Sequence, residues 1–219
     1  VKNNMVMTFQ PCSFYIKYLF KLLYVKKVVV AEEGLANITY KSLYKSCTDE
    51  LLFGKREAEI ISIFNKNLLE CPFPVLELSL GHLSKLCLKK NIINKTIIIG
   101  GPYVYDELLS KKDYYGYLNN IYIKYGKCDY YPHRREDVFE LKRNVKHIIV
   151  QNNEPIELSM VNSVELPARI ISGYSYAIFT LGKILPSKVE LNISKMMLDD
   201  SDLQLKIISY IKKNKTYKR

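Results

Sequence analysis

The sequence contains no C-x-x-C pair, and its number of cysteines is odd. The five are Cys12, Cys47, Cys71, Cys87 and Cys128. Small secreted domains that depend on disulfides carry cysteines in even numbers, and structural zinc sites carry them in close pairs. We therefore expect reduced, buried thiols in the cytoplasm and no metal site.

The sequence also lacks a secretory signal, a long apolar run, internal repeats and a low-complexity linker. Its most apolar N-terminal stretch, residues 14–25, is interrupted by Lys17 and Lys21. It is also far shorter than the roughly 20 apolar residues that cross a bilayer. A helix packed on a sheet is favoured here over a membrane-surface helix, because the strand-like segment 28–31 follows at once.

Acidic residues are outnumbered, since 33 Lys and Arg stand against 22 Asp and Glu and give a net charge of +11. A charge of this size indicates an anionic partner: a nucleotide, nucleic acid, an acidic glycan or an anionic membrane. The basic run 212–219 predicts peripheral contact of a cytoplasmic protein with the inner membrane, and a solvated chain end is the alternative.

Strand and helix patterns alternate along most of the chain, which is typical of an α/β protein with parallel sheets. Strands are expected at 28–31, 96–99, 129–131, 147–150, 169–172 and 188–193. Helices are expected at 14–25, 48–69, 114–125, 136–142, 176–184 and 202–213, and a further helix is expected to start near residue 155. In such a sheet, ligands bind outside the carboxyl ends of the strands. The residues Gly100, Gly101, His133, Glu157 and Ser175 fall at such ends.

The segment 130–136, Tyr-Tyr-Pro-His-Arg-Arg-Glu, follows one of these strands. Pro132 restricts the backbone, so His133 leaves the strand on a stiff connection. Arg134 and Arg135 add positive charge, and Glu136 is expected to open a helix whose N-terminus favours anions. This pattern predicts a phosphate site at His133, and the alternative is a surface loop with a capping histidine.

Two further strand ends carry candidate site residues. Gly100-Gly101-Pro102 follows 96–99, where glycines let backbone amides approach a ligand, or else mark a tight turn. Glu32 and Glu33 follow 28–31 and are costly to bury unless a site uses one of them. The alternative interpretation of these two residues is a solvated acidic turn.

Several motifs in order resemble those of bacterial sialyltransferases of glycosyltransferase family 52, the lipooligosaccharide sialyltransferases, and of the related capsular polysialyltransferases. The resemblance runs from about residue 28 to about residue 185. Its motifs are Glu32-Glu33-Gly34 with the following Leu-Ala-Asn-Ile, Pro132-His133, the segment 151–157 (Gln-Asn-Asn-Glu-Pro-Ile-Glu) and Gly173-Tyr174-Ser175. It implies a glycosyltransferase-B fold with two Rossmann-like domains: residues 1–95, a partial acceptor-side domain, and residues 96–219, which bind CMP.

The same resemblance implies transfer of sialic acid from CMP-sialic acid to a lipooligosaccharide or capsule glycan, without a metal or cofactor. By match, Glu33 removes the acceptor proton, with Asp106 as the rival base. His133 binds the CMP phosphate and assists its departure. Further donor-site residues are Gly100, Gly101, Pro102, Arg134, Gly173, Ser175 and Tyr176, and Glu157 would contact ribose or cytosine.

The sequence departs from the family in length and at Tyr176, where a second small hydroxyl residue is usual. An N-terminal Rossmann segment before Glu33 is expected to be incomplete. Two alternatives therefore stay open: a fragment that folds without turnover, and a non-catalytic nucleotide- or nucleic-acid-binding module. The 18 tyrosines and the charge would suit single-stranded nucleic acid. The basic residues are spread along the chain, however, and no nucleic-acid partner is expected.

Overall fold

The computed structural model describes residues 5–8, 25–31, 57–64, 74–173 and 175–194. The chain divides into two compact units, Val1–Ser79 and Leu80–Arg219. The domain boundary predicted at residue 95 falls inside a strand of the second unit, Asn91–Ile99. Both units are built on parallel sheets, so the predicted α/β class is confirmed.

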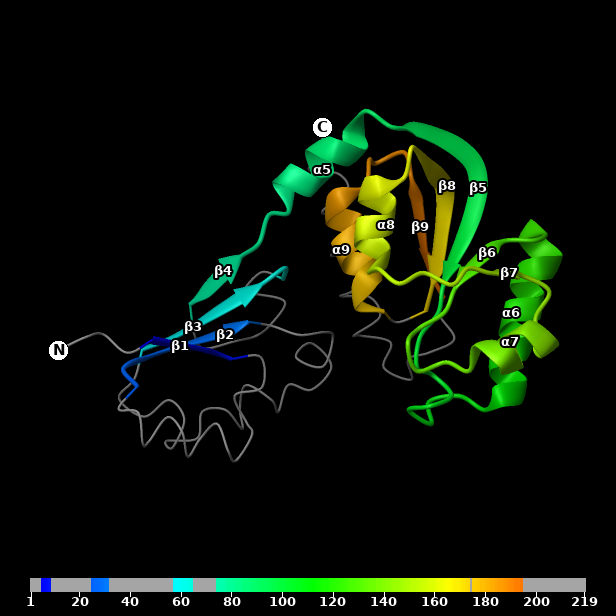
Figure 1. Ribbon diagram of the computed structural model, residues 1–219, viewed down its shortest axis with the longest axis horizontal. Coiled ribbons are helices and arrows are strands. Elements are labelled where there is room, and N and C mark those ends of the chain that lie inside the picture. Colours follow the sequence, from blue (N-terminus) through cyan, green and yellow to red (C-terminus); the bar gives the residue numbers. More distant parts are fainter. Residues whose placement is uncertain (1–4, 9–24, 32–56, 65–73, 174, 195–219) are drawn as a thin grey trace. The chain divides into compact units, whose positions relative to one another are not determined.

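The first unit contains a four-stranded parallel sheet in the order β1-β2-β3-β4 (Figure 1). Its strands are β1 (Met5–Thr8), β2 (Lys27–Ala31), β3 (Glu57–Ser62) and β4 (Val75–Glu77). Val28, Val29 and Val30 are buried, as expected for a β-branched strand in the middle of a sheet. The predicted strand at 28–31 is therefore confirmed.

The helix predicted over 48–69 is wrong in its described part, because Glu57–Ser62 forms β3 and pairs with β2. A short segment with charges next to isoleucines fits both a helix and a strand by its local pattern. Pairing along the whole of β2 decides the conformation here. The predicted helices at 14–25 and 202–213 lie outside the described residues.

The second unit is a five-stranded parallel sheet in the order β7-β6-β5-β8-β9. Its strands are β5 (Asn91–Ile99), β6 (Asp129–Tyr131), β7 (Ile148–Ile149), β8 (Glu165–Ser172) and β9 (Glu190–Ile193). The chain forms the central strand β5 of this sheet first, then adds β6 and β7 on one side of it, and finally adds β8 and β9 on the other side. Such a reversal creates a crevice at the strand ends.

In its described residues, this unit has the helices α5 (Gly81–Leu88), α6 (Lys111–Tyr125), α7 (Val138–Asn144), α8 (Ile156–Asn162) and α9 (Tyr176–Ile184). In Figure 1, α6 and α7 lie on one side of the sheet, and α8 and α9 lie on the other. The predicted helix 176–184 and strand 129–131 are confirmed residue for residue. The helix predicted from Glu136 begins at Val138 instead, because Asp137 takes the N-cap position.

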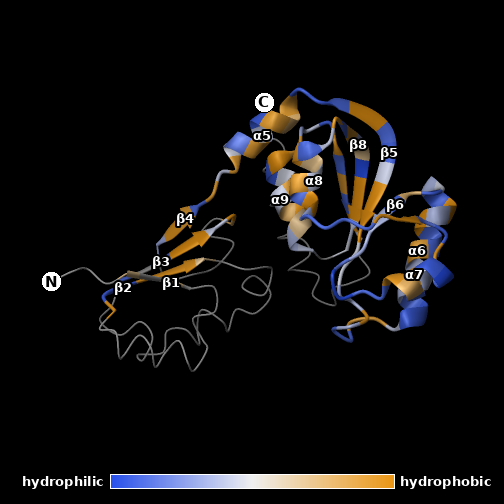
Figure 2. Cartoon of the chain, in the orientation of Figure 1, coloured by the Kyte–Doolittle hydropathy of each residue, from blue (hydrophilic) through white to orange (hydrophobic). Residues whose placement is uncertain are grey.

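A hydrophobic core packs the helices of this unit against its sheet. Polar and hydrophobic stretches alternate along strand β5 (Figure 2), and its last three residues, Ile97, Ile98 and Ile99, are buried. Ile98 belongs to a buried cluster with side chains of α6, β6 and α7, including Tyr114, Leu118, Tyr130 and Leu141. The aromatic stripe of α6 is thus partly core, as its helical spacing predicts.

Candidate functional site

A pocket of about 700 Å³ lies at the carboxyl ends of the strands in the second unit. It is lined by residues that follow β5, β6 and β7 and by the start of α9, namely Ile99, Gly100, Tyr131–Arg134, Glu136, Val138, Val150–Ile156, Ser175 and Ala177. Parallel pairing of β5 with both β6 and β8 brings these strand ends to one edge of the sheet. The location is the one that the alternating pattern predicts.

Four of the predicted site residues line this pocket: Gly100, His133, Arg134 and Ser175. Among the described residues, the other predicted ones lie outside its lining: Gly101, Pro102, Asp106, Glu157, Gly173 and Tyr176. Glu33 lies outside the described residues. The pocket lining therefore contains the histidine, one arginine and the serine, and leaves out both the rival base and the expected ribose contact.

His133 is half-buried, and its ring is oriented by its own turn. The ring nitrogen Nδ1 accepts a hydrogen bond from the backbone N–H of Arg135 at 3.3 Å. A neutral imidazole that accepts at Nδ1 carries its hydrogen on Nε2 and can donate there. Burial lowers the pKa of His133, and the charges of Arg134 and Arg135 lower it further, while Asp106 opposes them. The neutral donor form is thus favoured at neutral pH.

Glu136 is the site residue that the sequence did not reveal. It was expected to open a helix, but it precedes the helix, its side chain is half-buried, and its carboxylate accepts hydrogen bonds from Tyr130, Tyr114 and the backbone N–H of His133. Burial raises the pKa of Glu136, and these three hydrogen bonds oppose the rise. Its spacing of three residues from His133 matches the reach-back arrangement of a capping box, which was the available signal.

Gly100 serves a different purpose from the predicted one. Its backbone N–H donates to the carbonyl of Tyr131 at 2.8 Å, so this amide belongs to the sheet and is not offered to a ligand. A Cβ at Gly100 would lie 2.1 Å from Oε2 of Glu136 and 2.5 Å from the hydroxyl of Tyr130. At Gly101 a Cβ would collide with the ring of Tyr103. Close packing therefore explains both glycines.

Ser175 is the N-cap residue of α9, and its side chain makes no capping hydrogen bond to the helix. Its carbonyl accepts from the N–H of Ile178 at 3.2 Å, which begins the helical ladder. Ser175 and Ala177 both line the pocket, so the positive end of the helix dipole faces it. The combination offers a hydroxyl and a helix N-terminus to an anion.

Asp106 lies in the loop after β5 and is held by the segment that carries His133. Its carboxylate forms an ion pair with Arg135, and the guanidinium of Arg135 also lies 5.2 Å from the centre of the Tyr105 ring. Arg135 and Tyr105 line a smaller pocket of about 150 Å³, on which Glu136 also borders. The two arginines of the motif therefore line different pockets.

Glu157 contacts another helix. It accepts a hydrogen bond from the hydroxyl of Thr180, and this bond joins α8 to α9. The pocket wall of the segment 151–157 is instead formed by Gln151, Asn152, Asn153 and Glu154. Glu154 shapes that wall, since its carboxylate accepts from Ser159 and Asn162 at 3.2 Å each.

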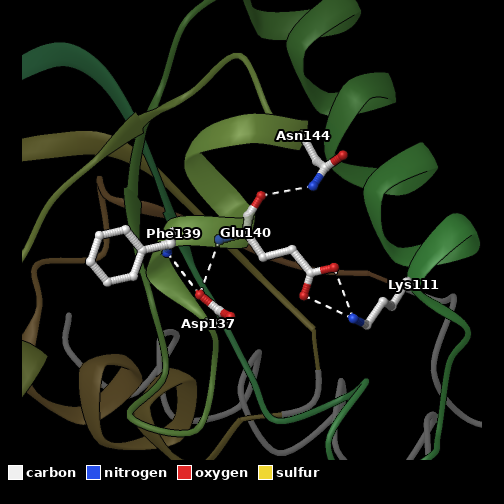
Figure 3. Close-up of polar contacts among 5 residues, drawn as sticks. All are labelled: Lys111, Asp137, Phe139, Glu140 and Asn144. Carbon is white, nitrogen blue, oxygen red and sulfur yellow. Dashed lines mark hydrogen bonds and ion pairs between the residues drawn. The ribbon is translucent and has the colours of Figure 1, made fainter.

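The helix after the histidine turn is anchored at its start (Figure 3). Asp137 Oδ1 accepts from the N–H groups of Phe139 and Glu140 at 2.9 and 3.0 Å. The carboxylate of Glu140 then pairs with Lys111 at the start of α6. These contacts fix the chain directly beyond Glu136, while the Phe139 ring points away from the ion pair.

Comparisons with known proteins give no family for this chain. No protein-family model matches it, and no curated protein shows a significant match. Within the described ranges, no group of three or more His, Cys, Asp or Glu side chains is placed to hold a metal ion. In the same part of the chain, every helix is too short or too polar to cross a membrane.

Proposed function

We propose that the pocket of the second unit binds the CMP moiety of CMP-sialic acid, and that the chain is a sialyltransferase. The observation that carries this proposal is the meeting of His133, Arg134 and Ser175 in one pocket at the ends of parallel strands. His133 and Arg134 come from the turn after β6 and Ser175 from the start of α9, and the resemblance assigns His133 and Ser175 to the nucleotide phosphate. Their meeting supports that assignment because the sheet, and not the resemblance, brings them together.

The three side chains suit a phosphate group chemically. His133 donates from Nε2, Arg134 supplies a permanent positive charge, and Ser175 offers a hydroxyl at the N-terminus of α9. Hydrogen bonds from charged donors to phosphate oxygens are among the stronger ones in proteins. The net charge of +11 favours the approach of an anionic donor substrate.

In the proposed reaction, a hydroxyl of the acceptor glycan attacks the anomeric carbon of sialic acid. The bond from that carbon to the phosphate oxygen breaks, and its electron pair stays on CMP. The acceptor proton passes to a carboxylate, for which Glu33 is the first candidate and Asp106 the rival. His133 stabilises the charge that develops on the departing phosphate, and we propose that these protein groups suffice without a metal.

The remaining wall of the pocket is assigned to the nucleoside. Amide side chains of Gln151, Asn152 and Asn153 offer both donors and acceptors to a base or a ribose. Contact of Glu157 with the nucleoside would require it to exchange its hydrogen bond with Thr180. Ribose and cytosine recognition by the 151–154 wall is therefore the simpler assignment.

We further propose that the two parallel-sheet units correspond to the two Rossmann-like domains of a glycosyltransferase-B enzyme. The first unit would belong to the acceptor side, where a lipooligosaccharide or capsule glycan binds. Such an enzyme would act in the cytoplasm, with its basic C-terminal run 212–219 against the inner membrane.

Calorimetric titration of the protein with CMP, with and without EDTA, tests the donor site. We expect a dissociation constant roughly in the micromolar-to-millimolar range, unaffected by EDTA, and cytidine should bind at least about tenfold more weakly because it lacks the phosphate. Arg134→Ala should weaken CMP binding, whereas Arg143→Ala, at an exposed arginine outside the pocket lining, is the matched control. Equal affinity for CMP and cytidine would contradict the proposal.

Transfer is assayed as release of CMP from CMP-sialic acid in the presence of galactose-terminated or sialylated acceptors. The assay uses this chain and a version extended by an N-terminal Rossmann segment. A protein that binds CMP but never transfers sialic acid, even when extended, would be the folded remnant named above as an alternative.

A further inference from the structure

We propose that Glu136 is a positioning residue, which holds the imidazole of His133 at the phosphate subsite of the pocket. The inference rests on the proposed function for its phosphate, but its geometry is independent of any ligand. Glu136 ends the turn that carries His133; one of its carboxylate oxygens accepts from the backbone of that turn, and the other binds Tyr130 and Tyr114.

The carboxylate connects three elements of the fold. Oε1 accepts from the hydroxyl of Tyr130 on β6 at 2.6 Å and from that of Tyr114 on α6 at 3.0 Å. The two hydroxyls lie 2.5 Å apart. Oε2 accepts from the backbone N–H of His133 at 2.6 Å. Glu136 thus ties the first residue of the turn to the packed interior.

The turn is closed in both directions. The backbone N–H of Glu136 donates to the carbonyl of His133 at 2.9 Å, while the Glu136 side chain accepts from the N–H of His133. Within this closed turn, the N–H of Arg135 reaches Nδ1 of the imidazole. The hydrogen bond that places the reactive hydrogen on Nε2 therefore depends on the turn that Glu136 holds.

The residues around the Glu136 carboxylate leave space for it and supply hydrogen-bond donors to it. Tyr114 and Tyr130 are buried, with 2% and 0% of their surfaces exposed, so their hydroxyls have little access to water as an alternative partner. The carboxylate occupies the space that a Cβ at Gly100 would need. An alanine at position 100 would therefore displace the Glu136 carboxylate, together with the hydroxyl end of Tyr130, without removing any polar group.

The far end of the segment does not depend on Glu136. Helix α7 has its own N-cap at Asp137 and its own ion pair from Glu140 to Lys111 (Figure 3). Loss of the Glu136 carboxylate is thus expected to loosen the turn at His133 while α7 stays docked on α6. This separation makes the role of Glu136 testable in a folded protein.

The experiment measures the pKa of the His133 imidazole by NMR, without any nucleotide. The His133 signal is assigned by its disappearance in His133→Gln, since the chain has three histidines. In the parent protein, burial beside two arginines holds this pKa below its ordinary value. In Glu136→Ala and in Gly100→Ala, a released imidazole becomes more solvated, so its pKa should rise toward about 6.5.

The sign of the shift separates positioning from charge. Removal of a nearby negative charge alone would lower the pKa of His133, so a rise in Glu136→Ala reports a change of position. Glu136→Gln keeps the shape and one acceptor oxygen, and should leave the imidazole near its original pKa or below it. Glu140→Ala removes a carboxylate that pairs with Lys111 and not with the His133 turn, and should leave the pKa unchanged.

CMP affinity is the second readout. Glu136→Ala and Gly100→Ala should weaken CMP binding by about tenfold and lower turnover by up to about 100-fold, as misplaced catalytic groups do. Glu140→Ala should change neither. Circular dichroism confirms that each variant is folded, and Gly100→Ala carries the test if Glu136→Ala does not fold.

An unchanged pKa of His133 in a folded Gly100→Ala or Glu136→Ala protein would overturn the positioning role, whether or not CMP binds. If instead the pKa rises in these variants but the parent protein does not bind CMP, the positioning of His133 by Glu136 stands and the nucleotide assignment fails.

Discussion

Asp106 and Arg135 form an ion pair in which Oδ1 lies 3.1 Å from Nη1. The contact joins the loop after β5 to the turn after β6, and it gives the rival base a cationic partner outside the lining of the larger pocket. The two neighbouring arginines therefore have different contacts: Arg134 lines the larger pocket, and Arg135 pairs with the carboxylate of Asp106.

This arrangement predicts that Asp106→Asn leaves sialic acid transfer within a few-fold of the parent, whereas Glu33→Gln lowers it by roughly 10²–10⁴-fold and leaves CMP binding nearly unchanged. The Asp106 pair is partly exposed, so its loss should cost about 1 kcal/mol of unfolding free energy or less. Transfer rates and urea unfolding measure the two effects. Abolished transfer in Asp106→Asn alone would assign the base to Asp106.

His133→Ala should affect both binding and chemistry. In the proposed reaction, it removes the donor to a phosphate that gains charge as the bond to sialic acid breaks. CMP should bind more weakly, and turnover should fall by about 10²–10³-fold, as for other preorganised donors. His82→Ala, at an exposed histidine of α5, is the matched control. Turnover equal to that of the parent would remove His133 from the catalytic machinery.

Lys90 should stabilise the second unit through the end of α8. Its ammonium group donates to the carbonyls of Met160, Val161 and Ser163, which lie in the last turn and just beyond it. Lys90→Met keeps the apolar stem and removes these donors, so unfolding free energy should fall by about 2 kcal/mol. Lys89→Met, at the exposed neighbour, should change it little, and equal losses would argue against this cap.

Stability should depend on the protonation of His147. This buried imidazole accepts at Nδ1 from the N–H of Cys128 and faces the carbonyl of Leu118 through Nε2, an arrangement that fits only the neutral ring. Burial lowers its pKa. Its contribution is therefore complete above about pH 6.5 and is lost as the pH falls through the lowered pKa, because the unfolded chain binds more protons there.

Urea unfolding of the parent and of His147→Gln between about pH 7.5 and pH 5.5 measures this effect. The parent should lose more stability than the variant over this range. Other groups also make stability depend on pH: His133 acts in the same direction as His147, and Glu136, with its raised pKa, acts in the opposite one. Both are present in the parent and in the variant, so the difference between the two curves isolates His147. Parallel curves would contradict the prediction.

The basic run 212–219 lies outside the described residues, and its membrane role stays a prediction. Each basic residue near an anionic surface contributes about 1 kcal/mol. Deletion of the run should weaken sedimentation with anionic vesicles at low salt and leave CMP affinity unchanged. Equal vesicle binding with and without the run would exclude it as the anchor.

The sequence alone determined the α/β class, the strand 129–131, the helix 176–184 and the meeting of His133 and Ser175. These predictions succeed because β-branched runs and helical apolar spacing report local conformation. Parallel strands then bring their carboxyl ends to one edge, whatever the details of packing. The position of the pocket follows from that topology.

Three features were decided only by the tertiary structure. They are the pairing that makes 57–62 a strand, the close packing that requires a glycine at position 100, and the burial of Glu136. In the sequence, Glu136 stands in a charged run and looks like a surface residue. Its environment comes from Tyr114 on a helix and from Gly100, which directly follows strand β5. Such partners are distant along the chain, and local periodicity carries no information about which distant side chain will satisfy a buried carboxylate.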